Sequence, residues 1–596
     1  MSESPSAART PASPRLAAAW ALVVLALAAV LAWWVERGRP VPLPEPASAS
    51  WPCLSYAPFR RAGHNPFDAN LIVSPAQIEA DLRILRERTR CVRTYGVGHG
   101  LAALPAIAQR LGLRVRLGAW LGRDEKANAL ELERAVALAR EFAGTVELLI
   151  VGSEVLLRRE LSPEALAAWL ERARRQVSVP VSYADVWEFW LRHAGLQEHV
   201  DVVTIHVLPY WEDEPVAVGD AVAHVYAIAG KVRARFPQRP LWVGETGWPA
   251  AGRQRAAAAP GRVEQARFMR EIAVRAQREP LDFNLIEAFD QPWKRALEGT
   301  AGGYWGVHDA QGEPRFAPHG SVQADPHWQR GPLAALCGGA LGALLGGVLG
   351  FRQGFMRRFG AGARLSGWPL AAHAALALGL PGALLAALCM AQWQMMSMAL
   401  RSPVQWLVDG LGTLTLGAFA AACGWRLAAR LRANAEDGVA WPGVAAAIIG
   451  GGLHDLHGQH ERHGRHGRDG QRLFAVLCAA ALFVAGALAL PLVFDARYRE
   501  LPWPLLVASA VLIWALRLSG DRLAAGAREE RVLAAVLLAC ALAIGIQEGP
   551  ANAQAALLAL GMAGFALAVL WPHGAARGRT HTSSASNTAG AAKPAE

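Results

Sequence analysis

Long uncharged apolar runs divide this chain of 596 residues and exclude a single soluble domain. The stretch 16–35 holds twenty consecutive uncharged residues. As a helix it matches the ~30 Å hydrocarbon core of a bilayer. Further runs fill much of 332–572, whereas 36–330 mixes polar and apolar residues. With 53% hydrophobic residues overall, the chain is predicted to be a membrane protein that carries one soluble domain.

Eight membrane spans are predicted, and the arginines between them predict their orientation. The first, 16–35, is interpreted as an uncleaved anchor rather than a signal peptide, because its apolar stretch is longer than a signal core. Arginine-rich loops alternate with arginine-poor loops, so both chain ends are predicted to be cytoplasmic, with 36–330 on the periplasmic side of the inner membrane. The other spans are 332–351, 369–396, 403–427, 473–494, 502–518, 531–547 and 552–572.

The remaining segments are predicted to connect or flank these regions. Residues 1–15 form a cytoplasmic N-terminus, 36–50 a stiff linker rich in proline, and 573–596 a disordered cytoplasmic tail. The histidine-rich loop 452–470 within the membrane domain fits either a metal-binding loop or a low-complexity linker. The linker is favoured because no tetrahedral ligand set stands out, and no metal or cofactor is predicted.

The net charge of +11 comes mostly from arginine. Many of these arginines lie in short loops between apolar runs, where membrane topology explains them. A nucleic-acid partner would require basic residues clustered on a soluble face, so the bilayer is the predicted partner and nucleic acid is not.

Apolar β-rich runs alternate with helical patterns eight times between residues 51 and 310. Eight such units in about 260 residues match a TIM (β/α)8 barrel. A doubly wound open sheet would need a glycine-rich loop after its first strand, and 56–60 offers none. Ser74 and Ser162, each before a proline, predict helix starts. The predicted fold is an α/β barrel over 51–325, followed by a membrane domain of about seven helices over 332–572. The strands are predicted at Pro52–Ala57, Cys91–Tyr95, Arg114–Trp120, Val146–Gly152, Pro180–Tyr183, Val200–His206, Leu241–Gly244 and Phe283–Phe289.

Two glutamates follow apolar strands at the positions where a barrel places its active site. Glu154 follows a strand that ends in Val151, Gly152 and Ser153, and Glu245 follows a strand that ends in Gly244. The carboxyl ends of barrel strands meet at one mouth. Glycoside chemistry needs two carboxyl groups across the scissile bond, one to donate a proton and one to attack or to activate water. Each glutamate could instead pair with an arginine, but two at matching positions favour catalysis.

Other residues at strand ends are candidates for binding a sugar. Aromatic rings stack on the apolar faces of sugar rings, although each of these rings could equally belong to the core. Arg93 could orient and ionise a carboxylate or form a structural ion pair. His206 could hydrogen-bond a catalytic carboxylate or a sugar hydroxyl. The aromatic candidates are Tyr56, Tyr95, Trp120, Tyr210, Trp211, Trp248, Trp293 and Trp305.

Cys53 and Cys91 are the two cysteines of the soluble region, and they begin the first two predicted strands. Neighbouring strands lie about 4.8 Å apart, which is within reach of a disulfide. An extracytoplasmic location would permit that bond.

Five motifs make residues 51–310 resemble glycoside hydrolase family 17, the TIM-barrel family of β-1,3-glucanases and β-1,3-glucan transglycosidases. Val151-Gly152-Ser153-Glu154-Val155 resembles the acid/base motif, and Gly244-Glu245-Thr246-Gly247-Trp248-Pro249 the nucleophile motif. The resemblance implies that Glu154 is the general acid/base and Glu245 the nucleophile. The other motifs are Val92-Arg93-Thr94-Tyr95, Ala288-Phe289-Asp290-Gln291-Pro292-Trp293-Lys294 and Tyr304-Trp305-Gly306-Val307.

The resemblance also marks Ser153, Phe289 and Lys294 as candidates for substrate binding. Two positions depart from the family pattern. Ser153 stands where the family usually has an asparagine that bonds the sugar 2-hydroxyl, and Gln291 stands where many relatives have glutamate. A serine hydroxyl is shorter than an asparagine amide, so the departure bears on rate and substrate preference more than on the class of reaction.

The function implied by this resemblance is a membrane-anchored retaining β-1,3-glucan transglycosidase that elongates or branches β-glucan. Bacterial relatives with one anchor, the barrel and several further spans are associated with β-1,3/1,6-glucan synthesis, so a glucan synthase or export complex is a candidate partner. The alternatives are a β-1,3-glucan hydrolase and a non-catalytic glucan-binding or export component. A nucleotide-sugar synthase is disfavoured because the short loops contain no Asp-x-Asp pair.

Overall fold

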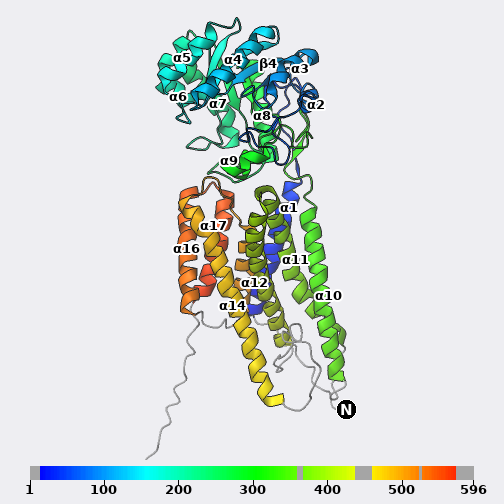
Figure 1. Ribbon diagram of the computed structural model, residues 1–596. Coiled ribbons are helices and arrows are strands. Elements are labelled where there is room, and N and C mark those ends of the chain that lie inside the picture. The colour runs from blue at the N-terminus through cyan, green and yellow to red at the C-terminus, as the bar shows by residue number, and fades with distance from the viewer. Residues whose placement is uncertain (1–13, 359–366, 436–458, 522–526, 572–596) are drawn as a thin grey trace, which may run out of the picture.

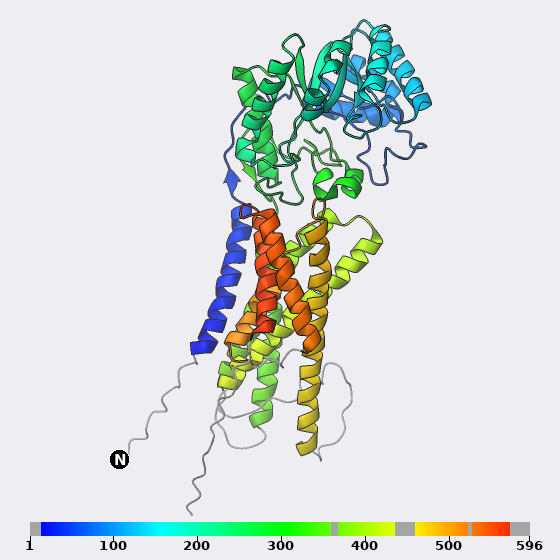
Figure 2. The ribbon, with the colours of Figure 1, turned by 90° about the vertical axis from the view of Figure 1, so that its left-hand side faces the viewer.

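The structure is a computed structural model that describes residues 14–358, 367–435, 459–521 and 527–571. A barrel lies at one end of a bundle of long helices (Figures 1 and 2). The predicted tail 573–596, almost all of the N-terminus 1–15, and the first part of the histidine-rich loop lie outside the described residues.

Eight parallel strands close into a barrel in sequence order. All eight strand predictions are confirmed, although several strands are shorter than predicted. Their side chains are almost all buried, because helices cover the outside of the barrel. The strands are β2 (Leu54–Ser55), β3 (Cys91–Arg93), β4 (Arg114–Ala119), β5 (Val146–Ser153), β6 (Val181–Val186), β7 (Val202–His206), β8 (Leu241–Thr246) and β9 (Phe283–Leu285).

Helices follow the strands and form the outer layer of the barrel. The predicted helix starts are confirmed, since Ser74 accepts a hydrogen bond from the Gln77 amide and Ser162 from the Ala165 amide, both at 3.2 Å. The helical elements are α2 (Pro75–Leu85), η1 (Leu101–Ala103), α3 (Leu104–Leu111), α4 (Glu125–Glu141), α5 (Pro163–Arg174), α6 (Trp187–Arg192), η2 (Ala194–His199), α7 (Val218–Arg235), α8 (Arg262–Arg278), η3 (Pro292–Lys294) and α9 (Arg295–Gly302).

A disulfide and a short antiparallel strand pair link segments of the soluble region that are distant in sequence. A disulfide joins Cys53 and Cys91, whose Cα atoms lie 4.5 Å apart at the amino ends of β2 and β3. Within the segment predicted as a linker, β1 (Pro40–Val41) pairs antiparallel with β10 (Val322–Gln323). The first and last parts of the soluble region are therefore tied to each other.

The remaining long helices form the bundle below the barrel (Figure 1). Each predicted span overlaps one of them: α1 (Pro14–Arg37), α10 (Arg330–Arg358), α11 (Gly367–Ala399), α12 (Pro403–Ala435), α14 (Gln459–Phe494), α15 (Pro504–Leu518), α16 (Arg528–Glu548) and α17 (Ala553–Leu570). Among the described residues, six of these are long and apolar enough to cross a membrane, namely α1, α10, α11, α12, α14 and α17.

Hydrogen bonds fix the barrel to the ends of the helices. The Arg295 guanidinium on α9 donates to the Met398 carbonyl at 2.8 Å. The backbone amide of Gln254 donates to the side-chain oxygen of Gln554 at 2.9 Å. The side-chain amide of Asn552 donates to the backbone carbonyl of Gln254 at 3.0 Å. These contacts come from loops and from α9 on the carboxyl side of the strands, so this face of the barrel is turned toward the bundle.

Candidate active site

Glu154 and Glu245 lie at the carboxyl ends of β5 and β8, and their side chains meet. One oxygen of each carboxyl group and a ring nitrogen of His206 all lie within 4.8 Å of one another. Retaining glycosidases hold their two carboxyl groups about 5–5.5 Å apart, and inverting enzymes about 6.5–9.5 Å apart. The short separation is closer to that of retaining enzymes and suits direct attack by one carboxylate on the sugar.

Arg93 holds the Glu245 carboxylate in place. It ends β3, is fully buried, and donates hydrogen bonds to the Glu245 carboxylate and, at 3.1 Å, to the Ser153 hydroxyl. A third donation, at 3.2 Å, goes to the Gly244 carbonyl. A buried guanidinium with three partners is fixed in orientation, and so is the carboxylate that it binds.

The same surroundings keep Glu245 ionised. Burial by itself raises the pKa of this carboxyl group, but the charges of His206, Arg93 and Lys294 and the Arg93 hydrogen bond outweigh that effect. The pKa of Glu245 therefore lies below its ordinary value. An ionised carboxylate is the form that can act as a nucleophile.

His206 bridges the two glutamates from the end of β7. Its Nδ1 lies 2.7 Å from Glu154 Oε1, and its Nε2 lies 3.5 Å from Glu245 Oε1 and 3.4 Å from an Arg93 nitrogen. The Nδ1–H of the imidazole can donate to the Glu154 carboxyl group, because a carboxyl oxygen accepts. Its position matches the sequence expectation that it contacts a catalytic carboxylate.

Glu154 differs from Glu245 in backbone and in exposure. Its φ of 55° lies in the left-handed region, which costs a non-glycine residue about 1–2 kcal/mol. Such conformations gather at functional sites. The Glu154 side chain is 28% exposed, against 7% for Glu245. The Glu154 carboxyl group is therefore the more accessible of the two.

These residues lie in a cleft of about 960 Å³. Both glutamates line it, and most of the predicted binding residues border it. Those are Tyr56, Tyr95, Trp120, Ser153, His206, Trp211, Trp293, Lys294 and Trp305.

Tyr210, Trp248 and Phe289 were predicted to bind sugar, and the structure corrects that prediction. All three are at most 1% exposed and do not line the cleft. Trp248 stacks on Phe268 of α8, and its indole donates to the Ala259 carbonyl at 2.9 Å. Trp248 thus packs against the helix layer, whereas the Tyr210 hydroxyl donates to the Arg253 carbonyl at 2.6 Å and Phe289 packs against Tyr56 and His308.

Trp120 is an open aromatic platform at the end of β4. Its side chain is 44% exposed, and the Arg158 guanidinium lies 4.2 Å from the ring centroid. The Glu131 carboxylate accepts from the amide nitrogens of Trp120 at 3.2 Å and of Val97 at 2.7 Å, which ties two strand-end loops together. An exposed and rigidly held indole is suited to stacking on a sugar ring.

Sequence reasoning missed Glu287, which forms an ion pair with Lys294. The Lys294 ammonium lies 3.1 Å from each Glu287 oxygen. Burial lowers the pKa of Lys294, but the carboxylates of Glu287, Glu298 and Glu245 outweigh it and raise the pKa overall. A cation therefore acts on Glu245. Glu287 lay within the strand predicted at Phe283–Phe289, whereas the observed β9 ends at Leu285, so the predicted strand bounds concealed its position near a strand end.

The set of Glu154, His206 and Glu245 has the donor types and spacing that a metal ion uses. Two cations already face it, because Arg93 binds Glu245 directly and the charge of Lys294 acts on the same carboxylate. Their repulsion makes the set a poor site for a third cation.

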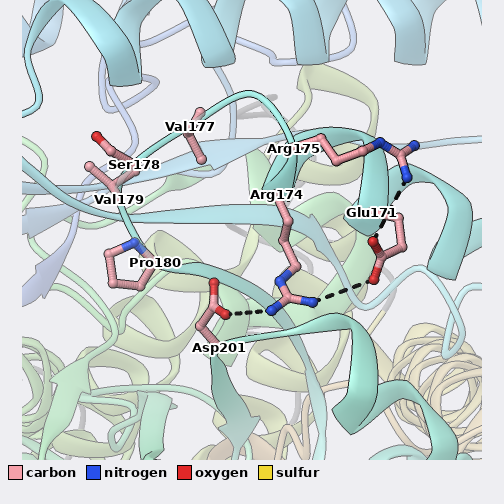
Figure 3. A pocket seen from close by; sticks show the side chains of 8 residues that line it. All are labelled: Glu171, Arg174, Arg175, Val177, Ser178, Val179, Pro180 and Asp201. Carbon is pink, nitrogen blue, oxygen red and sulfur yellow. Dashed lines mark hydrogen bonds and ion pairs between the residues drawn. The ribbon is translucent and has the colours of Figure 1, made fainter.

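A second hollow, of about 480 Å³, lies at the opposite end of the barrel. It borders Pro180 and Asp201, which directly precede β6 and β7. Figure 3 shows Arg174 interacting with both Asp201 and Glu171, and Arg175 forming an ion pair with Glu171. The Arg174 guanidinium lies 2.9 Å from Asp201 and 3.4 Å from Glu171. Each carboxylate there is neutralised by an arginine, so the hollow presents no pair of free acids.

Comparison with known proteins supports this picture. Residues 53–306 match the family model described as the BtgE/BtgC glycoside hydrolase domain. A glucan 1,3-beta-glucosidase from Candida albicans is 28% identical over 257 residues, which cover 38% of this chain and 82% of the relative. One from Schizosaccharomyces pombe is 29% identical over 237 residues, covering 36% and 72%.

Among solved structures, an active-site mutant of a β-1,3-glucanosyltransferase from Rhizomucor miehei in complex with laminaritriose is 23% identical, with a TM-score of 0.40. The match covers 44% of this chain and 95% of that chain. The family match over the barrel and the paired carboxyl groups at its mouth make residues 53–306 a glycoside hydrolase domain.

Proposed function

We propose that this chain is a membrane-anchored retaining β-1,3-glucan transglycosidase, with Glu245 as nucleophile and Glu154 as general acid/base. The observation that carries the proposal is the separation of at most 4.8 Å between their carboxyl oxygens, which suits the double displacement of retaining enzymes. The β-1,3-glucan substrate is supported by the names of the relatives from Candida albicans and Schizosaccharomyces pombe.

The first step forms a covalent glycosyl-enzyme. Glu245 attacks the anomeric carbon while Glu154 donates its proton to the glycosidic oxygen, so the carbon–oxygen bond breaks and the leaving chain departs with a hydroxyl group. Arg93 and Lys294 keep Glu245 ionised, and His206 holds the Glu154 carboxyl group at 2.7 Å. Glu154 then carries a negative charge and can act as a base.

The second step decides between transfer and hydrolysis. Glu154 takes the proton from a hydroxyl group whose oxygen attacks the anomeric carbon, and the bond to Glu245 breaks. A sugar hydroxyl gives a longer or branched glucan, and water gives a shorter one. Transfer is supported by a cleft of about 960 Å³, whose aromatic rings Trp120, Trp293 and Trp211 provide contacts for both a donor and an acceptor chain.

A β-1,3-glucan hydrolase is the second candidate, and the same relatives favour it because both are named glucosidases. A non-catalytic glucan-binding or export component would have no need for two carboxyl groups in contact with one histidine. The strained backbone of Glu154 at φ 55° likewise supports a chemical role.

The membrane location also belongs to the proposal. Six apolar helices of sufficient length support anchoring in a bilayer. The disulfide between Cys53 and Cys91 supports an oxidising compartment, such as the periplasm, for the barrel. The proposed role is remodelling of β-glucan during its synthesis, next to a glucan synthase or export complex.

The test uses the full chain, purified in detergent, with laminarioligosaccharides of defined length. Mass spectrometry and linkage analysis of the products separate longer or branched chains from shorter ones. We expect longer products from the wild type and none from Glu154→Gln or Glu245→Gln. If the wild type forms only shorter products, the activity is hydrolysis rather than transfer. Full activity in either variant would overturn the assignment of that residue.

A further inference from the structure

The loop between α14 and α15 reaches the active-site cleft of the barrel. Arg497 and Tyr498 of this loop line the same cleft as Glu154 and Glu245. The loop therefore belongs to the surface that a bound glucan would meet, although it lies far from the barrel in sequence.

The ring of Tyr498 forms an aromatic corner with the barrel residue Trp211. The two ring centroids are 5.8 Å apart in an edge-to-face arrangement. The Arg255 guanidinium lies 5.1 Å from the Trp211 centroid. Tyr498 is 43% exposed and lines the cleft, and the Arg497 guanidinium lies 5.8 Å from its ring centroid. Exposed aromatic rings that border a carboxylate-containing cleft are the surfaces on which sugar rings stack.

The backbone of the loop is held firmly against the barrel. Gly299 in α9 has a φ of 69°, and an added Cβ there would come within 2.5 Å of the Tyr498 carbonyl oxygen. Close by, the Arg253 guanidinium donates to the Arg499 carbonyl at 3.5 Å and pairs with Glu548 at the end of α16. The backbone at Tyr498 thus packs directly on α9, and its ring packs on Trp211, so part of the subsite is arranged before a ligand binds.

We propose that Tyr498, assisted by Arg497, forms a glucan-binding subsite that the helical region adds to the cleft of the barrel. The tyrosine ring stacks on the apolar face of one glucose unit, and the exposed Arg497 donates hydrogen bonds to its hydroxyl groups. A chain long enough to pass from the carboxylates to this corner uses the subsite, and a shorter chain does not. The inference rests on the proposed function, because it takes β-1,3-glucan as the occupant.

The consequence is a role for the helical region beyond anchoring. The barrel supplies the reacting groups, and the helix-connecting loop supplies part of the chain-length preference. Glucan strands would then be held between the barrel and the ends of the helices, with one end of the bound chain next to the bundle.

The experiment compares Tyr498→Ala with Tyr498→Phe and Arg499→Ala in the full-length protein, using laminarioligosaccharides of increasing length. Arg499 is the matched control, because it is exposed on the same loop and does not line the cleft. For Tyr498→Ala we expect KM to rise about tenfold, equivalent to ~1.4 kcal/mol, for the longer substrates only. The shortest cleaved substrate should keep its kcat/KM, and Tyr498→Phe and Arg499→Ala should behave as wild type. Arg497→Gln should raise KM for the same long substrates by a smaller factor.

Each outcome bears on a different claim. If the wild type is active and Tyr498→Ala matches it at every substrate length, the subsite is overturned while the proposed function stands. Equal losses of kcat/KM for short and long substrates would also overturn the subsite, because they would indicate general damage to the cleft. A wild type that neither cleaves nor binds laminarioligosaccharides would overturn the proposed function, and the subsite with it.

Discussion

The two ends of the barrel use charged side chains in opposite ways. At the amino end, the Arg116 guanidinium lies between Glu147 and Asp282, at 2.9 Å from each. Carboxylates and arginines there neutralise one another, and a disulfide crosses between two strands. At the carboxyl end, buried Arg93 and Lys294 both act on Glu245, and the second acid, Glu154, remains partly exposed.

This contrast indicates a division of labour along each strand. Charges that pair off completely can stabilise the fold but are not free to react, whereas charges arranged around an open cleft can act on a substrate. The same separation is general in TIM barrels, where the carboxyl-end loops carry catalysis and the amino end carries stability. Matched substitutions at the two ends should therefore separate loss of activity from loss of stability.

The largest effect is expected for Glu245→Gln, compared with Glu147→Gln at the amino end. Removing the nucleophile should lower kcat on the order of 10⁴-fold or more. Glu147→Gln should leave kcat unchanged and lower the free energy of unfolding by about 1 kcal/mol. Steady-state kinetics and thermal melting measure both. A Glu147→Gln variant as inactive as Glu245→Gln would break the distinction between the two ends.

Arg93→Met, compared with Arg116→Met, tests the electrostatic part of the contrast. Loss of the Arg93 hydrogen bonds should reduce kcat by about 10²–10³-fold. The ionised form of Glu245 attacks, so activity is lost as the pH falls through its pKa. Because the charge of Arg93 lowers that pKa, Arg93→Met should move the acidic limb of the pH profile to higher pH.

Arg116→Met should leave that limb in place and should affect stability instead. The pH dependence of kcat/KM, measured for both variants, shows in which of them the acidic limb moves. An acidic limb that does not move in Arg93→Met would contradict the assigned role of Arg93, and one that moves equally in both variants would show that the effect is not local.

Replacing both Cys53 and Cys91 by alanine should weaken the fold without changing the chemistry. The bridge closes a loop with a sequence separation of 38, and its loss should cost about 2–4 kcal/mol in the free energy of unfolding. Denaturant titration measures the loss, and kcat/KM at 25 °C should stay within about twofold of wild type. A loss of kcat/KM at that temperature as large as that of Arg93→Met would show that the two ends are coupled.

The smallest effect is expected for Arg174→Gln, in the hollow of Figure 3. Its ion pairs with Asp201 and Glu171 are partly exposed. The side chains are 30% exposed for Arg174, 37% for Asp201 and 34% for Glu171. Such pairs contribute about 0–1 kcal/mol to stability. The free energy of unfolding should therefore change little, and kcat/KM should not change. A loss of activity here would instead assign a function to this end of the barrel.

The sequence predicted the barrel and the proximity of Glu154 and Glu245 because both depend on local patterns. Strands and helices alternate with clear apolar periodicity, and Glu154 and Glu245 each follow a strand. In a closed barrel all strand ends meet, so position along a strand is enough to bring two distant residues together. The family resemblance of the surrounding motifs then added the roles that we propose for each.

Other parts of the site depend on packing, which these patterns do not encode. Tyr210 and Trp248 follow strands as Trp120 does, yet both are buried, and Trp248 stacks on Phe268 of α8. The strand-end position fixes the rim of the barrel but not the direction of a ring. Tyr498 was missed because it reaches the cleft only through the docking of one region on the other.

The stereochemistry of the first product tests most directly the claim that Glu154 and Glu245 act as a retaining pair. Proton NMR of the full-length protein acting on a laminarioligosaccharide identifies the configuration of the new glycosidic linkage in products of transfer. In products of hydrolysis, recorded before mutarotation, it identifies the anomer of the new reducing end. We expect the β-configuration first, because two displacements at one carbon preserve configuration. An initial α-configuration would mean a single displacement at the anomeric carbon and would contradict the proposed mechanism.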